Sequence, residues 1–191
     1  MNPRYLLYKV FCLYQLNINT WFVAVSAIPL VILYPLAKRF TKWPQIILGL
    51  TFSWAVPTAW SAANEEWNLG IFIMYLATVF WIIGYDTIYG CQDKNEDEIF
   101  GIKNSAVSAK NFLTLFVGCS YSLMFCLLII SGYLLNNNIF WYIGVSICGL
   151  HLTYQVIKIK NIEQNNPLQI FKSNVILGLL LTFSSFGNHI S

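Results

Sequence analysis

Residues 69–84 read LGIFIMYLATVFWIIG, an uncharged apolar run that leads directly into the acidic segment YDTIYGCQDKNEDE at residues 85–98. When it is helical, such a run approaches the thickness of the hydrocarbon core of a bilayer, which is about 30 Å. An ionisable residue placed directly against the end of such a helix is costly and tends to have a partner. The two segments together predict a membrane-spanning helix that ends in a functional acidic motif.

Similar apolar runs recur along the whole chain of 191 residues, of which 57% are hydrophobic and 10% are charged. Soluble domains carry roughly 25% charged residues. Besides the run at 69–84, we expect spans at 21–37, 43–63, 112–135, 139–157 and 175–186. The sequence therefore predicts an all-α integral membrane protein with about six transmembrane helices, forming a single domain over residues 1–191.

The net charge argues against a nucleic-acid-binding protein, and the cysteines indicate free thiols. The net charge of +3 is small and spread over the loops, so it does not indicate nucleic-acid binding. The five cysteines contain no C-x-x-C pair and lie mostly within apolar runs, which indicates buried free thiols. Cys91 lies beside the acidic motif, and we interpret it as a filler residue because no basic partner in the sequence activates it.

The placement of basic residues predicts the orientation in the membrane. Lysine and arginine occur in the loops after the first, third and fifth runs, whereas the loop after the second carries Glu65 and Glu66. Basic loops mark the cytoplasmic side, so the acidic motif is expected to face the cytoplasm from an inner membrane. Arg4 and Lys9 contradict this orientation. Residues 5–16 are apolar but too close to Met1 to complete a span, so the chain is expected to be truncated at its N-terminus.

The acidic motif has a helical spacing. Asp86, Tyr89, Asp93 and Asp97 are three, four and four residues apart, so on one continuous helix they would share a face. Carboxylates this close need a cation between them, and hard oxygen ligands suit Mg²⁺ that is held jointly with substrate phosphates. Gly90 disfavours an unbroken helix, so the alternative is that the motif straddles a helix end. In both cases the motif predicts a metal-diphosphate site.

Other interpretations of the charged stretch remain open. It could be a solvated loop, and Lys94 and Lys103 could be topology determinants instead of point charges that contact phosphate oxygens. A transporter could use a cytoplasmic carboxylate cluster to select a cation. Transporters usually place such groups near the bilayer midplane, whereas every acid in this chain lies at the end of a span or in a loop.

Two stretches carry a resemblance to a known family. Residues 85–97, followed by Gly101-Ile102-Lys103-Asn104-Ser105-Ala106, resemble the second aspartate-rich motif of the UbiA superfamily of membrane prenyltransferases, D-x-x-Y-x-x-x-D-x-x-x-D with a trailing G-I-K-S. Residues 33–57 are similar to the 4-hydroxybenzoate branch of that superfamily. The resemblance implies a fold of nine transmembrane helices around a central cavity. The six predicted spans would be the fourth to ninth helices, and residues 5–16 a stump of the third.

The resemblance also implies an activity and a set of site residues. The expected reaction is Mg²⁺-dependent transfer of a polyprenyl group from polyprenyl diphosphate to the ring of 4-hydroxybenzoate, a step in ubiquinone biosynthesis. Asp86, Asp93 and Asp97 would hold Mg²⁺. Tyr89 would orient a carboxylate or line the cavity, and Lys94 and Lys103 would hold the diphosphate.

One element of the family pattern does not occur in this sequence. The first aspartate motif, N-D-x-x-D-x-x-x-D, is absent, so half of the usual metal-diphosphate site is missing. We therefore expect a fragment or a split half, inactive alone unless a partner supplies the first three helices. The alternative is an inactive remnant.

Overall fold

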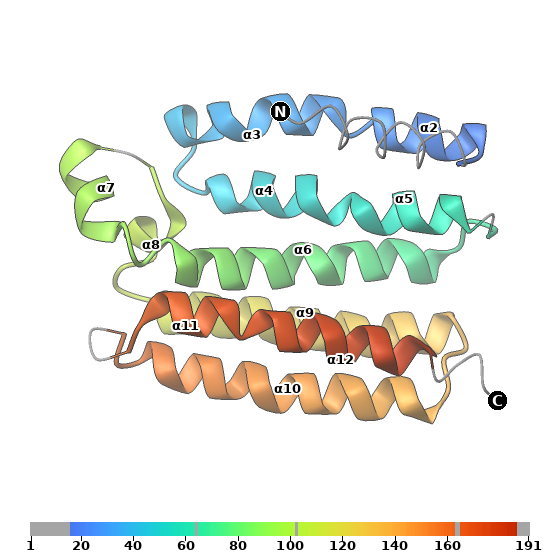
Figure 1. Ribbon diagram of the computed structural model, residues 1–191. Coiled ribbons are helices and arrows are strands. Elements are labelled where there is room, and N and C mark those ends of the chain that lie inside the picture. Colours follow the sequence, from blue (N-terminus) through green and yellow to red (C-terminus); the bar gives the residue numbers. More distant parts are fainter. Residues whose placement is uncertain (1–15, 64, 102, 163–164, 187–191) are drawn as a thin grey trace, which may run out of the picture.

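The computed structural model describes residues 16–63, 65–101, 103–162 and 165–186, and within these ranges every regular element is a helix. Figure 1 shows the long helices lying side by side as a bundle, with the short helices α7 (Lys94–Phe100) and α8 (Ser105–Ser108) gathered at one end. The predicted all-α membrane fold is thereby confirmed. The expected stump of a helix at residues 5–16 lies outside the described residues apart from Leu16.

The first two helical segments that run the length of the bundle, here called rods, are each broken into two helices. Helices α2 (Ile18–Val25) and α3 (Ile28–Phe40) follow one another in line and supply a candidate membrane span at Ile18–Ala37. Pro29 lies in the first turn of α3, where the missing N–H costs no hydrogen bond. Helices α4 (Pro44–Ser53) and α5 (Ala55–Ala62) return alongside, with a break at Trp54.

The remaining helices match the predicted apolar runs or extend beyond them. Helix α6 (Leu69–Tyr89) continues past residue 84, and α9 (Leu113–Leu134) and α10 (Ile139–Ile159) match their predicted runs closely. Helices α11 (Pro167–Lys172) and α12 (Asn174–Phe186) together extend the short run at 175–186 to a full span, Pro167–Phe186.

Five helices of the described chain are long and apolar enough to cross a membrane, instead of the expected six. The predicted run at 43–63 is the exception, because α4 and α5 carry polar residues such as Gln45, Ser53 and Thr58. Figure 1 shows α4 and α5 beside α6 along its length, so this rod still belongs to the bundle. Breaks of this kind are tolerated in membranes where neighbouring helices satisfy the freed backbone groups.

Asparagine side chains begin five of the described helices. Each of these residues holds the N-cap position and accepts a hydrogen bond from a backbone N–H in the first turn, which satisfies a donor that the helix itself cannot. The five are Asn17 before α2, Asn68 before α6, Asn104 before α8 (Ser105–Ser108), Asn138 before α10 and Asn166 before α11. The starts of these helices are therefore encoded locally in the sequence.

Close contacts between α6, α9 and α10 form the core. Tyr121 of α9 is 3% exposed and lies against Gly84 of α6, where an added Cβ would be 2.3 Å from a ring carbon. Trp141 of α10 is 4% exposed and lies against Gly132 of α9. Its indole N–H donates to the Leu128 carbonyl at 3.2 Å. Trp141 is therefore a core residue of the bundle.

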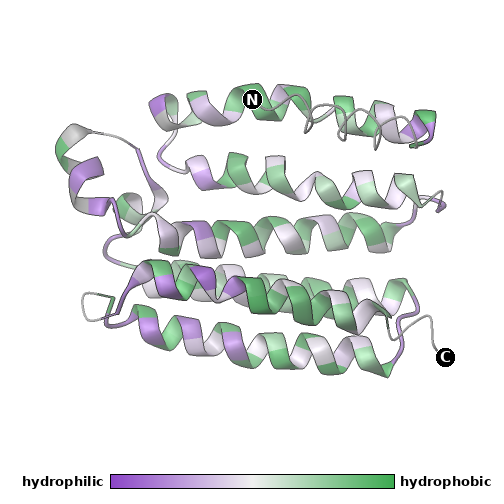
Figure 2. Ribbon diagram, viewed as in Figure 1, coloured by the Kyte–Doolittle hydropathy of each residue, from purple (hydrophilic) through white to green (hydrophobic). Residues whose placement is uncertain are grey.

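Figure 2 shows that hydrophobic residues predominate along the long helices and that many polar residues lie at the end of the bundle that carries α7 and α8. Leu150 is 75% exposed and Phe22 is 70% exposed, which suits side chains that face lipid. Figure 1 shows that the connections α3–α4, α6–α9 and α10–α11 all lie at one end, whereas α5–α6 and α9–α10 lie at the other. The basic loops and the acidic motif therefore share one end of the bundle, as the alternation of charges predicts.

Candidate functional site

The acidic motif straddles the end of a helix. Helix α6 ends at Tyr89, and Gly90 follows as its C-cap, with its N–H donating to the Asp86 carbonyl at 2.8 Å. Helix α7 (Lys94–Phe100) begins after Asp93 and ends at Gly101, which has φ +67° and so adopts the left-handed conformation that glycine favours. Of the two arrangements considered from the sequence, the one that breaks the motif at Gly90 is realised.

The three candidate aspartates lie at one end of the bundle in different settings. Asp86 is partly buried on α6 and interacts electrostatically with Tyr34 of α3 and Tyr85 of its own helix. Asp93 is exposed at the start of α7, and Asp97 is partly buried within α7. Across the described ranges, no group of three or more His, Cys, Asp or Glu side chains is arranged to hold a metal ion. The aspartates are thus close to one another along the chain without forming a preassembled cage.

Tyr89 and Lys94 contact groups other than the aspartates. The Tyr89 ring packs on Phe171 of α11 with 4.8 Å between centroids. Lys94 opens α7 and acts on the nearby Cys91. Burial raises the pKa of the Cys91 thiol to about 11, although the charge of Lys94 acts in the opposite direction. A basic neighbour is therefore present after all, but the thiol stays protonated at neutral pH, as a filler residue requires.

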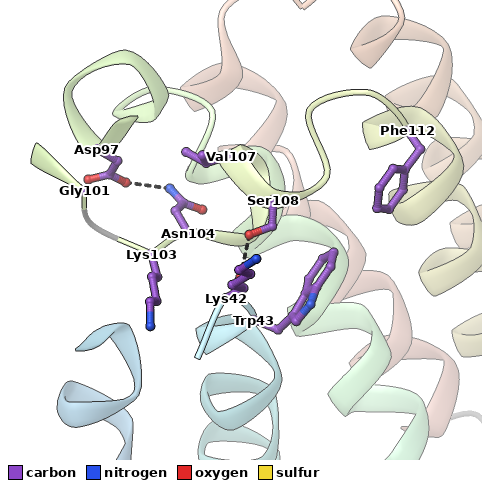
Figure 3. Close-up of a pocket in the computed structure, with 9 residues that line it drawn as sticks. All are labelled: Lys42, Trp43, Asp97, Gly101, Lys103, Asn104, Val107, Ser108 and Phe112. Carbon is purple, nitrogen blue, oxygen red and sulfur yellow. Dashed lines mark hydrogen bonds between the residues drawn. The ribbon is translucent and has the colours of Figure 1, made fainter. Parts of the chain in front are cut away.

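A pocket of about 530 Å³ lies between α7, α8 and the α3–α4 connection. Figure 3 shows the side chains that line it: Lys42, Trp43, Asp97, Gly101, Lys103, Asn104, Val107, Ser108 and Phe112. The Ser108 hydroxyl donates to the Lys42 carbonyl at 2.9 Å, which joins α8 to the α3–α4 connection. The pocket brings together two predicted site residues, Asp97 and Lys103, and adds a second cation, Lys42. Such a combination suits an anion whose charge is shared between lysines and a metal.

A buried amide lies at the wall of this pocket. Asn104 is 6% exposed, and its Nδ2 donates to Asp97 Oδ2 at 2.7 Å and to the Gly90 carbonyl at 3.1 Å. Its Oδ1 accepts from Gln45 Nε2 at 3.1 Å and from the Ala106 N–H at 2.9 Å. One side chain therefore connects the end of α6, helix α7 and the start of α4.

A second buried amide supports the first. Gln45 is 5% exposed at the start of α4, and its Oε1 accepts from the Ser105 N–H at 3.0 Å and from the Ser105 hydroxyl. A Cβ at Gly90 would lie 2.6 Å from Asn104 Oδ1, so the close approach of the amide requires glycine at this position. The glycine that ends α6 thus has a packing reason as well as a capping role.

No role was predicted from the sequence for Lys42, Gln45 or Asn104. A signal for Gln45 was present, because a primary amide within an apolar run at a span end needs hydrogen-bond partners. Asn104 stood within the recognised motif, but its contact with Asp97 depends on the turn at Gly101. Lys42 carries no signal that separates it from other loop lysines.

Comparisons with known proteins identify the family of this chain. The family model for the UbiA prenyltransferase family matches residues 6–182. The mitochondrial 4-hydroxybenzoate polyprenyltransferase of Dictyostelium discoideum is 38% identical over 173 residues, which cover 86% of this chain and 36% of that protein. The 4-hydroxybenzoate octaprenyltransferase of Francisella tularensis subsp. novicida (strain U112) is 38% identical over 170 residues, which cover 89% of this chain and 60% of that protein.

No solved structure matches the chain. The chain spans no more than 60% of the length of these two relatives. The family match nevertheless covers nearly the whole chain, including the acidic motif, Lys103 and Asn104. On this evidence the chain belongs to the UbiA prenyltransferase family.

Proposed function

We propose that this chain carries the part of a 4-hydroxybenzoate polyprenyltransferase that holds the diphosphate of the prenyl donor through its second aspartate motif. The observation that carries this proposal is the pocket in which Asp97, Lys103 and Lys42 come together beside the end of α6. The two relatives named above support 4-hydroxybenzoate as the acceptor. In the reaction, the C–O bond between the prenyl group and diphosphate breaks, and a C–C bond forms at the ring carbon ortho to the hydroxyl. That ring carbon then loses its proton.

The donor set at this end of the bundle fits Mg²⁺. Magnesium sites in such enzymes use one or two carboxylates and complete their coordination with substrate phosphates and waters, so a closed cage of protein ligands is not required. In this proposal the carboxylate ligands would come from Asp86, Asp93 and Asp97. When bound, it supplies neutralisation of the charge that develops on the departing diphosphate.

The remaining groups bind and shield the substrate. Lys103 and Lys42 line the pocket and would contact phosphate oxygens, with Lys94 nearby at the start of α7. The apolar helices would hold the polyprenyl chain and exclude water from the reacting carbon. The acidic end would face the cytoplasm from an inner membrane, since the basic loops gather there.

We further propose that activity needs a segment equivalent to the front of the relatives, because the first aspartate motif is absent from this sequence. The test is to express the chain in a bacterium that lacks its own 4-hydroxybenzoate prenyltransferase. It is expressed alone and together with the N-terminal segment of the Francisella relative that precedes the match. Transfer of labelled 4-hydroxybenzoate into lipid-extractable product is measured in membranes, and product is expected only with both segments.

The outcomes of this experiment separate the two proposals. Robust product from the chain alone would support prenyl transfer and refute the need for a second segment. If neither combination forms product although both segments are found in the membrane, the proposed transferase function is contradicted. The Asp97→Asn variant serves as the negative control for background prenylation.

Replacing Lys103 by glutamine is expected to raise the KM for polyprenyl diphosphate about tenfold, the effect of losing one charge-assisted contact. The KM for 4-hydroxybenzoate should change less than twofold, because the acceptor carries no diphosphate. Both constants are measured in membranes that contain the two segments. Lys160→Gln is the matched control, since Lys160 is exposed in the α10–α11 connection at the same end of the bundle and does not line the pocket. Equal changes in both KM values would contradict a phosphate-binding role.

A further inference from the structure

We infer that Asn104 is a positioning residue that fixes the Asp97 carboxylate toward the diphosphate pocket, and that Gln45 fixes Asn104 in turn. This inference rests on the proposed function and extends it to residues outside the aspartate motif. Its basis is the buried chain of hydrogen bonds that runs from the start of α4 through Asn104 to Asp97.

The contact with Asp97 is a strong one. The 2.7 Å distance from Asn104 Nδ2 to Asp97 Oδ2 is typical of a hydrogen bond to an ionised carboxylate, which is roughly twice as strong as a neutral one. The second hydrogen of the same amide goes to the Gly90 carbonyl. Because both hydrogens are engaged, Asn104 holds the carboxylate of α7 at a set position relative to the end of α6.

The orientation of the Asn104 amide is determined by its neighbours. If the amide were flipped, its oxygen would face the Asp97 carboxylate and the Gly90 carbonyl, which are both acceptors. In the observed orientation, Oδ1 instead accepts from Gln45 Nε2 and the Ala106 N–H. Only one orientation of Asn104 therefore satisfies all of its partners.

The Gln45 amide is likewise held in one orientation by its partners. Its Oε1 accepts two hydrogen bonds from Ser105, so its Nε2 is left to donate to Asn104. Both amides are more than nine-tenths buried, where a missing partner is costly. Asp97 and Asn104 both line the pocket, so the effect of this network should be measurable on a ligand bound there.

The test measures binding of Mn²⁺ with inorganic pyrophosphate to the purified chain in lipid nanodiscs, by the loss of the electron paramagnetic resonance signal of free Mn²⁺. The variant Asn104→Ser keeps a hydroxyl acceptor for the α8 cap, but its side chain is too short to donate to Asp97. We expect it to weaken binding about tenfold, as for the loss of one bond to a charged group. Asn166→Ser is the matched control, since Asn166 also caps a helix but does not line the pocket, and it should leave binding unchanged.

A double-mutant cycle with Asp97→Asn separates positioning from general structural damage. If Asn104 acts through Asp97, Asn104→Ser should weaken the binding of Mn²⁺ with pyrophosphate by less than a further twofold once Asp97 is replaced. An equal loss in both backgrounds would overturn the inference. Gln45→Glu is the second variant. A glutamate carboxylate cannot donate to Asn104 Oδ1, and Asp97 itself is unchanged, so this variant should also weaken binding. Thermal melting by tryptophan fluorescence identifies variants that fail to fold.

Different results would contradict the positioning role of Asn104 and the proposed diphosphate site. If the chain binds pyrophosphate and Asp97→Asn weakens this binding, but folded Asn104→Ser and Gln45→Glu do not, the positioning role is wrong and the proposed function stands. If the wild-type chain shows no binding of Mn²⁺ with pyrophosphate, either alone or together with the N-terminal segment of the Francisella relative, both the diphosphate site and the positioning role are refuted.

Discussion

Replacement of Asp97 by asparagine is expected to lower the rate of prenyl transfer by about 10²–10³-fold, the usual effect of removing one preorganised electrostatic group at the reacting centre. Asp97 lines the pocket together with Lys103, and its carboxylate is held by Asn104. Asparagine keeps the size of the side chain but removes the negative charge that would hold the metal and diphosphate. The rate is measured in membranes that contain both segments, with the Mg²⁺ concentration varied.

The same experiment includes a control at the opposite end of the bundle. Glu66 lies in the α5–α6 connection and is exposed, so Glu66→Gln should leave the rate within twofold of the unaltered chain. If Asp97→Asn also stays within twofold at limiting Mg²⁺, Asp97 does not act in the reaction. A higher half-saturating Mg²⁺ concentration for Asp86→Asn would extend the assignment to the end of α6.

Adding one methyl group at Gly84 is expected to destabilise the bundle by about 3 kcal/mol, toward the upper end of the usual cost of overpacking a core. A Cβ at this position would lie 2.3 Å from a ring carbon of Tyr121. The ring cannot move away cheaply, because Tyr121 is buried and its hydroxyl donates to Gln155 at 2.7 Å. The melting temperature of Gly84→Ala in detergent, followed by tryptophan fluorescence, checks this prediction.

Gly118→Ala on α9 is the matched control. Its nearest neighbour would be a Val156 methyl group at 3.7 Å, an ordinary contact distance. Alanine there gains about 1 kcal/mol in helix propensity, so this variant should melt at the same temperature or higher. If the two alanine variants melt alike, the packing of α6 against α9 at Gly84 is looser than the structure indicates.

The ends of the helices illustrate where the sequence was sufficient and where it was not. Asparagine caps at the starts of α6 and α10 agree with the predicted runs, because a cap is a contact within a few residues of chain. The run at 43–63 was predicted as one span, and the structure divides it between α4 and α5 at Trp54, which the apolar composition alone does not indicate. The end of α6 at Tyr89 was anticipated as an alternative through Gly90, whose close contact with Asn104 appears only in the structure.

The amino-acid sequence by itself determined that this protein is a helical membrane protein of the prenyltransferase type. Long apolar runs in a bilayer have few structural solutions, because each backbone polar group must be satisfied within its own helix. The aspartate motif was recognisable for a similar reason, since its spacing is a property of one short segment. These features depend on residues that are close along the chain, so they can be predicted without knowledge of the tertiary structure.

The tertiary structure decided how the site is assembled. Gln45 and Asn104 are 59 residues apart along the chain, and Lys42 meets Lys103 in one pocket through the return of α4 beside α6. The orientation of the buried amides follows from satisfying every donor and acceptor at once, which requires all the partners to be in place. Periodicity and motifs describe neighbours within one element, whereas the site is made of groups that become neighbours only when the helices pack.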